Sequence, residues 1–436
     1  MKTNRKETII SVITLGCSKN VVESEVLMNQ LKSNNIKISH DKYIKGSKAV
    51  IINTCGFIED AKQQSIDTIL EYVQLKEQGK IENVYVIGCL SQRYKNDLEK
   101  SIPEVDKYFG SFQLHDIVKE LGLEYKNELI GERLLSTPKH YAYLKISEGC
   151  DRTCSFCAIP LIKGKHVSKS IENLVDEAKL LVKKGVKEIL LIAQDLTYYG
   201  VDIYKKQALA ELLNQLSDIK GLKWIRLHYT YPAKFPLDVI KVMKEKDNIC
   251  KYLDIPVQHI SDNILSKMRR NITKAETINL LNFIKTEIPE IALRTTILVG
   301  HPGESKADFD ELYNFVKDYE FDRLGVFTYS HEENTYSFKN FKDDVPEKEK
   351  YRRKDELMSL QMEISYNKNL AKVGKILNVI IDEKSDGIYY GRTEYDSPEV
   401  DNRVIIKSEK NLKKGNFYKV KITGCEEYDL IGSILS

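Results

Sequence analysis

Three short apolar runs rich in β-branched residues occur within the first 90 positions, and each ends at a cysteine. They read TIISVITLGC, KAVIINTC and NVYVIGC, and they end at Cys17, Cys55 and Cys89. Each run is followed by apolar residues at helical spacing, as at Val22 and Val26. Strand and helix in alternation predict a parallel α/β sheet. The carboxyl ends of parallel strands share one edge, so we expect the three cysteines to meet there.

The three cysteines have two interpretations. A free cysteine is among the most buried residue types, so each one alone could be a core residue. However, all three occupy the same place in the repeated unit, and glycines lie beside them at positions 16, 56 and 88. This repetition favours a shared metal site.

Residues 136–345 contain six further strand-like runs with helical patterns between them. The runs read YAYLKIS, EILLIA, WIRLHYT, YLDIPV, LRTTILV and RLGVFTY. Six β/α units predict a partial (β/α)6 barrel rather than a full eightfold one, with its chemistry at the carboxyl ends of the strands. Polar stretches follow the strands, beginning with EGCDRTCSFC after the first and QDLTYYG after the second.

The remaining sequence predicts a long helix and a small β-barrel. The helix begins near Pro346 and ends near Gly374, and about five short alternating strands follow it. We therefore expect an α/β protein with three domains. These are an α/β sheet domain over 1–135, a partial barrel over 136–345 with a helical extension to about 372, and an antiparallel β-barrel over 373–436.

Composition limits the class of protein. Eight cysteines among 436 residues are too few for a disulfide scaffold, and their spacing indicates metal ligation in a reducing compartment. No stretch reaches the ~18 consecutive apolar residues that span a membrane. We expect a cytoplasmic protein that does not enter a membrane.

A second cysteine group, Cys150, Cys154 and Cys157, has the spacing C-x3-C-x2-C. A structural zinc site needs four ligands, and His166 is the only additional candidate in this loop. Thiolates also hold iron–sulfur clusters. A cubane cluster held by three cysteines leaves one iron open to bind a substrate or cofactor.

This loop, after the first strand of a partial barrel and with Phe156 before its last cysteine, resembles the radical S-adenosylmethionine (SAM) enzymes. Together, the three domains resemble the methylthiotransferases of that superfamily, whose C-terminal module is the TRAM domain. The resemblance implies two [4Fe-4S] clusters and SAM, which serves as radical source and methyl donor. One SAM would methylate a sulfur at the auxiliary cluster, and a second would yield a 5′-deoxyadenosyl radical that removes a hydrogen from the substrate.

Matching motifs to this family implies roles for individual residues. Cys17, Cys55 and Cys89 would hold the auxiliary cluster, and Cys150, Cys154 and Cys157 the radical cluster. The SAM-contacting residues would be Phe156, Gln194, Asp195 and Arg294. Arg294 could equally be a salt-bridged barrel residue. No catalytic side chain beyond the cluster ligands is implied.

Two substrates dominate the family, an adenosine in tRNA and an aspartate of the twelfth small-subunit ribosomal protein. The stretches DIPVQHIS and YYGRTEYDSPEVD resemble the ribosomal-protein branch. Residues 371–436 also hold nine Lys and two Arg against eleven Asp and Glu, whereas an RNA-binding module is basic. We expect an acidic partner surface for a basic ribosomal protein, made of Glu394, Asp396, Glu399 and Asp401.

Alternatives to that surface and that function stay open. The four acids could belong to an ordinary solvated loop. The chain could be a tRNA-adenosine methylthiotransferase, or a non-catalytic iron–sulfur protein that binds RNA or ribosomes. The resemblance identifies neither the sulfur donor nor the electron donor.

Four residues depart from the family pattern or lie outside it. Lys163 replaces a usual arginine, and His301 replaces a usual phenylalanine. We interpret His301 as a packed or hydrogen-bonded loop residue rather than a catalytic one. Cys250 and Cys425 match no cluster position, and we expect both in the core.

Overall fold

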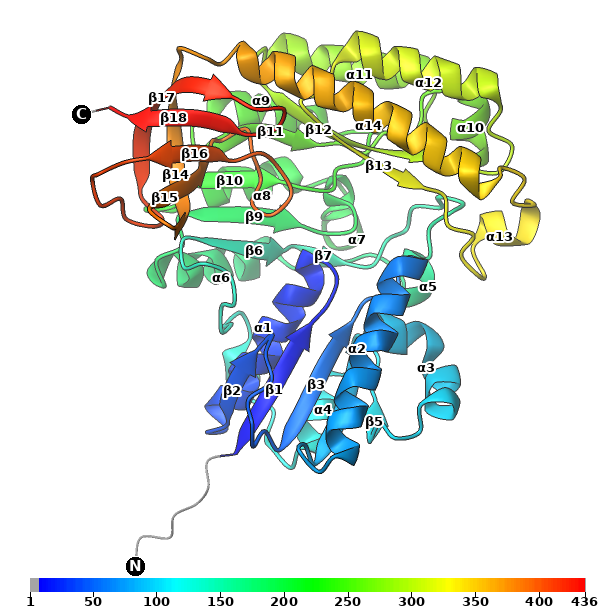
Figure 1. The fold of residues 1–436 in the computed structure, drawn as a ribbon, viewed down its shortest axis with the longest axis vertical. Coiled ribbons are helices and arrows are strands. Elements are labelled where there is room, and N and C mark those ends of the chain that lie inside the picture. Colours follow the sequence, from blue (N-terminus) through cyan, green and yellow to red (C-terminus); the bar gives the residue numbers. More distant parts are fainter. Residues whose placement is uncertain (1–7, 436) are drawn as a thin grey trace, which may run out of the picture. The chain divides into compact units, whose positions relative to one another are not determined.

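The computed structural model describes residues 8–435. Contacts within the chain divide it into two compact units. Among the described residues, the first contains 8–137, 148–151 and 158–167, and the second contains 138–147, 152–157 and 168–435. Figure 1 shows the sheet of the first unit in blue and the sheets of the second in green to red. The first unit thus includes Cys150, the first cysteine of the C-x3-C-x2-C loop, and the segment that follows Cys157.

The first unit is built on a five-stranded parallel sheet in the order β2-β1-β3-β4-β5. Its strands are β1 (Ile9–Thr14), β2 (Lys37–His40), β3 (Ala49–Thr54), β4 (Asn83–Gly88) and β5 (Lys107–Tyr108). The three predicted strands, β1, β3 and β4, form the centre of the sheet. The two edge strands were not predicted, because both are short and β2 is largely polar.

Helices cover both faces of this sheet, which explains why its central strands are continuous apolar runs. The helices of this unit are α1 (Ser18–Ser33), α2 (Glu59–Glu77), α3 (Cys89–Ser101), α4 (Leu114–Glu120), the 3-10 turn η1 (Asn127–Leu129) and α5 (Ile159–Lys163). On β3, Val50 and Ile52 pack toward α2 and α3, whereas Ala49 and Ile51 pack toward α1 and α4.

The second unit contains the predicted partial barrel. Six parallel strands form an open sheet in the order β13-β12-β11-β10-β9-β6. They are β6 (Tyr141–Lys145), β9 (Glu188–Ile192), β10 (Trp224–Leu227), β11 (Ile249–Asp254), β12 (Ala292–Val299) and β13 (Arg323–Thr328). Two-residue strands β7 (Ser147–Glu148) and β8 (Val167–Ser168) lie on either side of the cysteine loop in the sequence.

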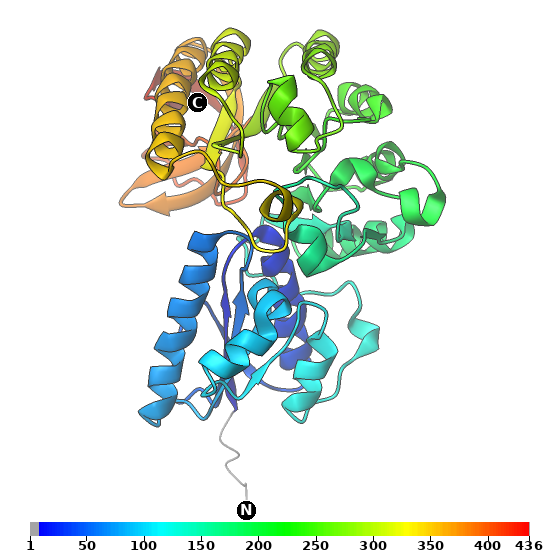
Figure 2. The same cartoon turned by 90° about the vertical axis from the view of Figure 1, so that its right-hand side faces the viewer.

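Helices follow the barrel strands, as predicted (Figure 2). The longer ones are α6 (Ile171–Lys183), α8 (Leu209–Ser217), α9 (Leu237–Glu245), α11 (Lys274–Glu287) and α12 (Lys306–Tyr319). The shorter ones are η2 (Leu196–Tyr198), α7 (Val201–Tyr204), α10 (Asp262–Lys267) and α13 (Tyr336–Asn340). Capping boxes at Thr273 and Ser305 fix where α11 and α12 begin.

A long helix, α14 (Glu347–Leu370), precedes a closed five-stranded barrel in the order β14-β15-β16-β18-β17. The strands are β14 (Ile376–Ser385), β15 (Ile388–Arg392), β16 (Val404–Lys407), β17 (Phe417–Cys425) and β18 (Leu430–Ile434). Its pairs are antiparallel as predicted, except for the parallel pair of β16 and β18. Cys250 is fully buried, and Cys425 packs at the edge of the small barrel's core. Across residues 8–435, every helix is too short or too polar to cross a bilayer.

Candidate metal and cofactor sites

The loops that carry Cys17, Cys55 and Cys89 converge at the carboxyl edge of the first unit's sheet. A Cβ atom on Gly16 would lie 2.7 Å from the Cβ of Cys55. A Cβ atom on Gly56 would lie 3.0 Å from the carbonyl carbon of Cys89. Any side chain at either glycine would therefore push two cysteine loops apart. The expected convergence of the three strand ends is present in the fold.

Asn20 in the first turn of α1 joins all three loops, and its role was not predicted. Its Nδ2 donates to the carbonyl oxygens of Leu15, at 2.8 Å, and Thr54, at 3.1 Å. Its Oδ1 lies 3.9 Å from the Sγ of Cys89. The residue is 1% exposed. The only sequence signal was an amide three positions after Cys17, at the start of a helix.

The thiols of this trio lie in different surroundings. Cys17 is exposed, Cys55 is half-buried and Cys89 is buried. Burial raises the pKa of the Cys55 thiol above its ordinary value and that of Cys89 to about 12. A thiolate at Cys89 thus needs a nearby positive charge, such as that of a metal.

The segment from Ala158 to Lys163, which contains helix α5, lies against Cys89. Cys89 packs with Ala158 and Ile162, and Ala158 directly follows Cys157 in the chain. The Lys163 side chain is 2% exposed, and its Nζ lies 2.8 Å from Oε1 of Glu23. Its positive charge favours the thiolate of Cys89 and partly opposes the rise in that pKa. Lys163 is therefore a buried cation beside the trio.

The C-x3-C-x2-C loop begins with a backbone turn that requires glycine. Gly149 has a φ of +76°, and a Cβ atom there would lie 2.0 Å from the Lys165 carbonyl oxygen. Cys150 donates its N–H to the Gly164 carbonyl oxygen at 3.1 Å. Cys150 belongs to the first unit, whereas Cys154 and Cys157 belong to the second. Further along, Cys157 donates its N–H to the carbonyl oxygen of Cys154.

Ser155, between two cysteines of this loop, fixes it to the barrel. Its N–H donates to the Met268 carbonyl oxygen, and its own carbonyl oxygen accepts from the Ser337 N–H at 2.7 Å. His301 Nε2 lies 3.3 Å from the hydroxyl of Ser155 and 3.0 Å from that of Ser337. Burial lowers the pKa of His301 to about 4, so its ring is neutral at pH 7. His301 is hydrogen-bonded within the fold, in agreement with our interpretation of it.

The residues expected to contact a cofactor lie in several places. Gln194 and Asp195 directly follow β9. Asp195 is buried; its Oδ2 lies 2.7 Å from Nε of Arg152. Phe156 packs beside Ile264, Met268, Leu298 and Tyr329.

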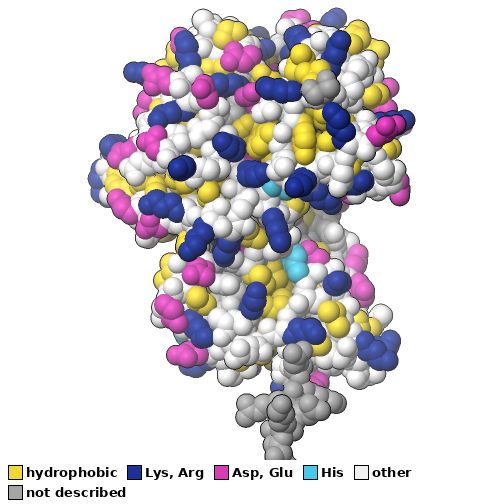
Figure 3. Space-filling model, turned by 90° about the vertical axis from the view of Figure 1, so that its left-hand side faces the viewer, with side chains coloured by type: hydrophobic (Ala, Val, Ile, Leu, Met, Phe, Trp, Pro, Cys, Tyr) yellow, Lys and Arg dark blue, Asp and Glu magenta, His cyan; other side chains and the backbone are white. Residues whose placement is uncertain are grey.

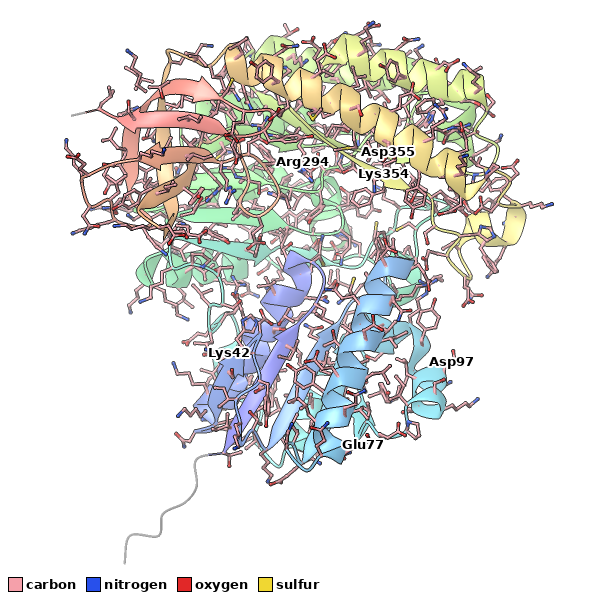
Figure 4. All side chains as sticks on the ribbon, in the orientation of Figure 1. Lys42, Glu77, Asp97, Arg294, Lys354 and Asp355 are labelled. Atoms are coloured by element: carbon pink, nitrogen blue, oxygen red, sulfur yellow. The ribbon has the colours of Figure 1, made fainter. Side chains whose placement is uncertain are left out.

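The Arg294 side chain is held by ion pairs with two carboxylates. It is the third residue of β12 (Figure 4), and its Nη1 donates to Oδ1 of Asp401 at 2.8 Å. Its Nε also lies 3.7 Å from Oδ1 of Asp254. This favours the alternative interpretation of Arg294 as a salt-bridged barrel residue.

The prediction of an acidic partner surface is wrong for Asp396 and Asp401. Both carboxylates are at most 2% exposed and pair with arginines of the barrel, Asp396 with Arg323 and Asp401 with Arg294. Burial alone would raise the pKa of Asp396, but Arg323 holds it below its ordinary value. These acids face inward because they neutralise barrel cations.

The other two acids of that predicted surface also make contacts with the barrel. Glu399 accepts from the hydroxyls of Tyr141, at 2.8 Å, and Tyr143, at 2.9 Å. Glu394 Oε2 accepts from the Lys251 N–H. On the face drawn in Figure 3, Lys and Arg side chains lie among Asp and Glu side chains. Taken together, residues 393–402 connect the small barrel to the larger one and do not present a set of free carboxylates.

The trio of Cys17, Cys55 and Cys89 fits an iron–sulfur cluster by its donor chemistry. Among residues 8–435, no group of three or more His, Cys, Asp or Glu side chains could hold a single metal ion as placed. A cubane spreads its thiolate ligands more widely, because each thiolate binds a different iron. The three cysteines lie at one sheet edge, and Gly16 and Gly56 let their loops approach closely because they have no side chains. This arrangement matches such a cluster.

Three known protein families match parts of the chain. Residues 9–110 match the uncharacterized protein family UPF0004, residues 144–316 match the radical SAM superfamily, and residues 373–435 match the TRAM domain.

Several known proteins are similar to this chain along nearly its whole length. Ribosomal protein uS12 methylthiotransferase RimO of Phocaeicola vulgatus is 54% identical over 431 residues, covering 99% of this chain and all of the relative. The protein of the same name from Porphyromonas gingivalis is 55% identical over 437 residues, covering both chains fully. RimO of Cytophaga hutchinsonii is 54% identical over 435 residues, 100% of this chain and 99% of its own.

Solved structures share the fold at low identity. The radical SAM methyltransferase TsrM from Kitasatospora setae, with cobalamin and a [4Fe-4S] cluster bound, has a TM-score of 0.56 at 12% identity. It covers 94% of this chain and 84% of its own. The cobalamin-dependent radical enzyme OxsB has a TM-score of 0.53 at 13% identity, covering 81% of this chain and 56% of its own.

Proposed function

Because the chain belongs to the RimO family of ribosomal protein uS12 methylthiotransferases, we propose that it transfers a methylthio group to uS12, onto the β-carbon of an aspartate. The observation that carries this proposal is identity of 54–55% along the entire length of chains with that name. These identities confirm the predicted resemblance. They favour neither the tRNA-adenosine alternative nor the non-catalytic one.

This reaction would use two clusters with different roles. Cys17, Cys55 and Cys89 would hold the auxiliary cluster, and the C-x3-C-x2-C cysteines would hold the radical cluster. When bound, these clusters and SAM would supply the reductive cleavage that starts hydrogen abstraction and the sulfur that is transferred. The protein's own residues then have to hold, orient and shield these groups.

Several side chains would hold the cysteine loops in position. Asn20 ties the three auxiliary loops together, and Ser155 with His301 anchors the radical loop to the barrel. Asp195, at the carboxyl end of β9, orients Arg152 at the rim. Carboxyl strand ends are where barrel enzymes bind their substrates, which supports a SAM site near Gln194 and Asp195.

The experiment that tests the proposal uses the full chain with both clusters reconstituted without oxygen. The protein is mixed with SAM, a one-electron reductant, a sulfide source and purified uS12. We expect mass spectrometry to find one methylthio group replacing a hydrogen on one aspartate, and Cys55→Ala and Cys154→Ala each to abolish it. Bulk tRNA in a parallel reaction is the control substrate. Methylthiolation of tRNA but not of uS12 would overturn the substrate assignment.

A further inference from the structure

A buried arginine contacts one of the predicted radical-cluster cysteines. Arg270 lies between α10 and α11 and is 4% exposed. Its Nη1 donates to Sγ of Cys154 at 3.3 Å, and its Nη2 donates to the carbonyl oxygen of Pro256 at 2.6 Å. The guanidinium is thereby fixed from two sides.

The backbone holds Arg270 in place at some cost. Its neighbours Arg269 and Asn271 both have positive φ, 55° and 54°, which is unfavourable for residues other than glycine. The Arg270 N–H donates to the Leu265 carbonyl oxygen at 3.0 Å, closing the turn after α10. Strained backbone of this kind persists where the surrounding structure determines it, often at functional sites.

An aromatic ring places a second cation beside the first. The guanidinium carbons of Arg270 and Arg152 each lie 4.2 Å from the ring centroid of Tyr231. The Tyr231 hydroxyl donates to the Arg270 carbonyl oxygen at 2.8 Å and lies 3.6 Å from Sγ of Cys154. Cys154 is therefore next to a pair of positive charges stacked on one ring.

The charge of Arg270 lacks a carboxylate in direct contact. Within residues 8–435, its hydrogen bonds go to a sulfur and a carbonyl oxygen, and its Nε is buried without a partner. Arg152, by contrast, is paired with Asp195. Buried charges are normally paired, so the surroundings of Arg270 are suited to an anion that includes the sulfur of Cys154.

We propose that Arg270 is a positioning residue that raises the reduction potential of the radical cluster by hydrogen bonding to the Cys154 thiolate. This inference rests on the proposed function. Reduction adds one electron, and hence one negative charge, to the cluster. A fixed cation in a poorly solvated site stabilises the more negative state more than the oxidised state. Hydrogen bonds to cluster sulfurs and local charge are established determinants of such potentials.

The test compares Arg270→Met with Arg269→Met, which removes the same charge one position away without touching Cys154. The full chain with both clusters is titrated anaerobically with dithionite and followed by electron paramagnetic resonance. The radical cluster is identified as the one whose signal changes when SAM is added. We expect Arg270→Met to decrease the ratio of reduced to oxidised radical cluster about tenfold at a fixed potential, or ~59 mV for a one-electron couple. Arg269→Met should match the wild type.

The other outcomes also decide the question. If Arg270→Met retains its iron and its midpoint potential is unchanged, the inference is wrong. If that variant fails to assemble, Arg270→Gln decides, because it keeps amide donors but removes the charge and shortens the side chain. A lowered potential in Arg270→Gln supports the inference, and an unchanged one refutes it. If even the wild type lacks a SAM-sensitive cluster signal, the proposed function itself fails.

Discussion

Arg294 of β12 and Asp401 of the 393–402 loop form an ion pair, with Nη1 2.8 Å from Oδ1, although 107 positions separate them. The loop comes from the small barrel, and the arginine belongs to the partial barrel. Asp401 also accepts from the hydroxyl of Tyr252 at 2.8 Å. The loop that was predicted to face a partner instead fastens two domains of the second unit.

This pair gives the first prediction. We expect Arg294→Ala and Asp401→Ala to lower the free energy of unfolding, with a coupling energy of about 1–3 kcal/mol in a double-mutant cycle, because the carboxylate is buried. Urea denaturation of the four proteins measures it. If Arg294 instead contacts SAM, Arg294→Ala alone will weaken SAM binding, whereas Asp401→Ala will not.

A second prediction concerns acid stability. Glu188 of β9 is fully buried and pairs with Arg226 and Arg392, each at 2.8 Å. Burial would raise the pKa of Glu188, but Arg392 and Arg226 outweigh it and hold that pKa below the ordinary 4.5. The folded protein therefore binds this proton less readily than the unfolded chain does. The stability from Glu188 is present above about pH 4.5 and is lost as the pH falls below it.

The matching variant is Glu188→Gln, studied in cluster-free protein. At neutral pH we expect it to lose about 3–5 kcal/mol of unfolding free energy, since it leaves the buried Arg226 without a carboxylate and leaves Arg392 with Asp382 alone. Its stability should then fall less steeply than that of the wild type as acid is added. Parallel acid profiles for the two proteins would show that Glu188 does not contribute to the pH dependence.

The features predicted from sequence are those with a local periodic signal. Long apolar runs and helical stripes predicted the central strands of both parallel sheets, and parallel strand order then predicted that Cys17, Cys55 and Cys89 would converge. Short edge strands such as Lys37–His40 carry too few residues for a pattern. The inward role of Asp396 was not predicted, because its partner Arg323 lies 73 positions away and only the folded chain brings them together.

A third prediction concerns the buried pair beside the auxiliary trio. Lys163→Met leaves the Glu23 carboxylate, whose side chain is 8% exposed, without its cation. We expect a loss of about 3–5 kcal/mol in the unfolding of the first unit. The double variant Glu23→Gln with Lys163→Met should recover most of this loss, because the buried Glu23 charge is then gone and Glu148, 3.8 Å from Lys163 Nζ, is more exposed. Thermal denaturation checks both, and a double variant no more stable than Lys163→Met would refute the pairing argument.

The fourth prediction concerns Asn20, whose amide connects the loops of the auxiliary trio. Asn20→Ala removes two buried donors, to Leu15 and Thr54, which costs about 1–3 kcal/mol for each carbonyl left unsatisfied. Because those carbonyls precede the cysteines, we expect the loops to separate and the auxiliary cluster to be lost. The iron content should fall from two clusters toward one, while the SAM-sensitive signal of the other cluster persists.

Asn96→Ala, at an exposed position of α3, is the matched control and should retain all its iron. Full iron loading of Asn20→Ala would show that the three loops hold their cluster without this amide.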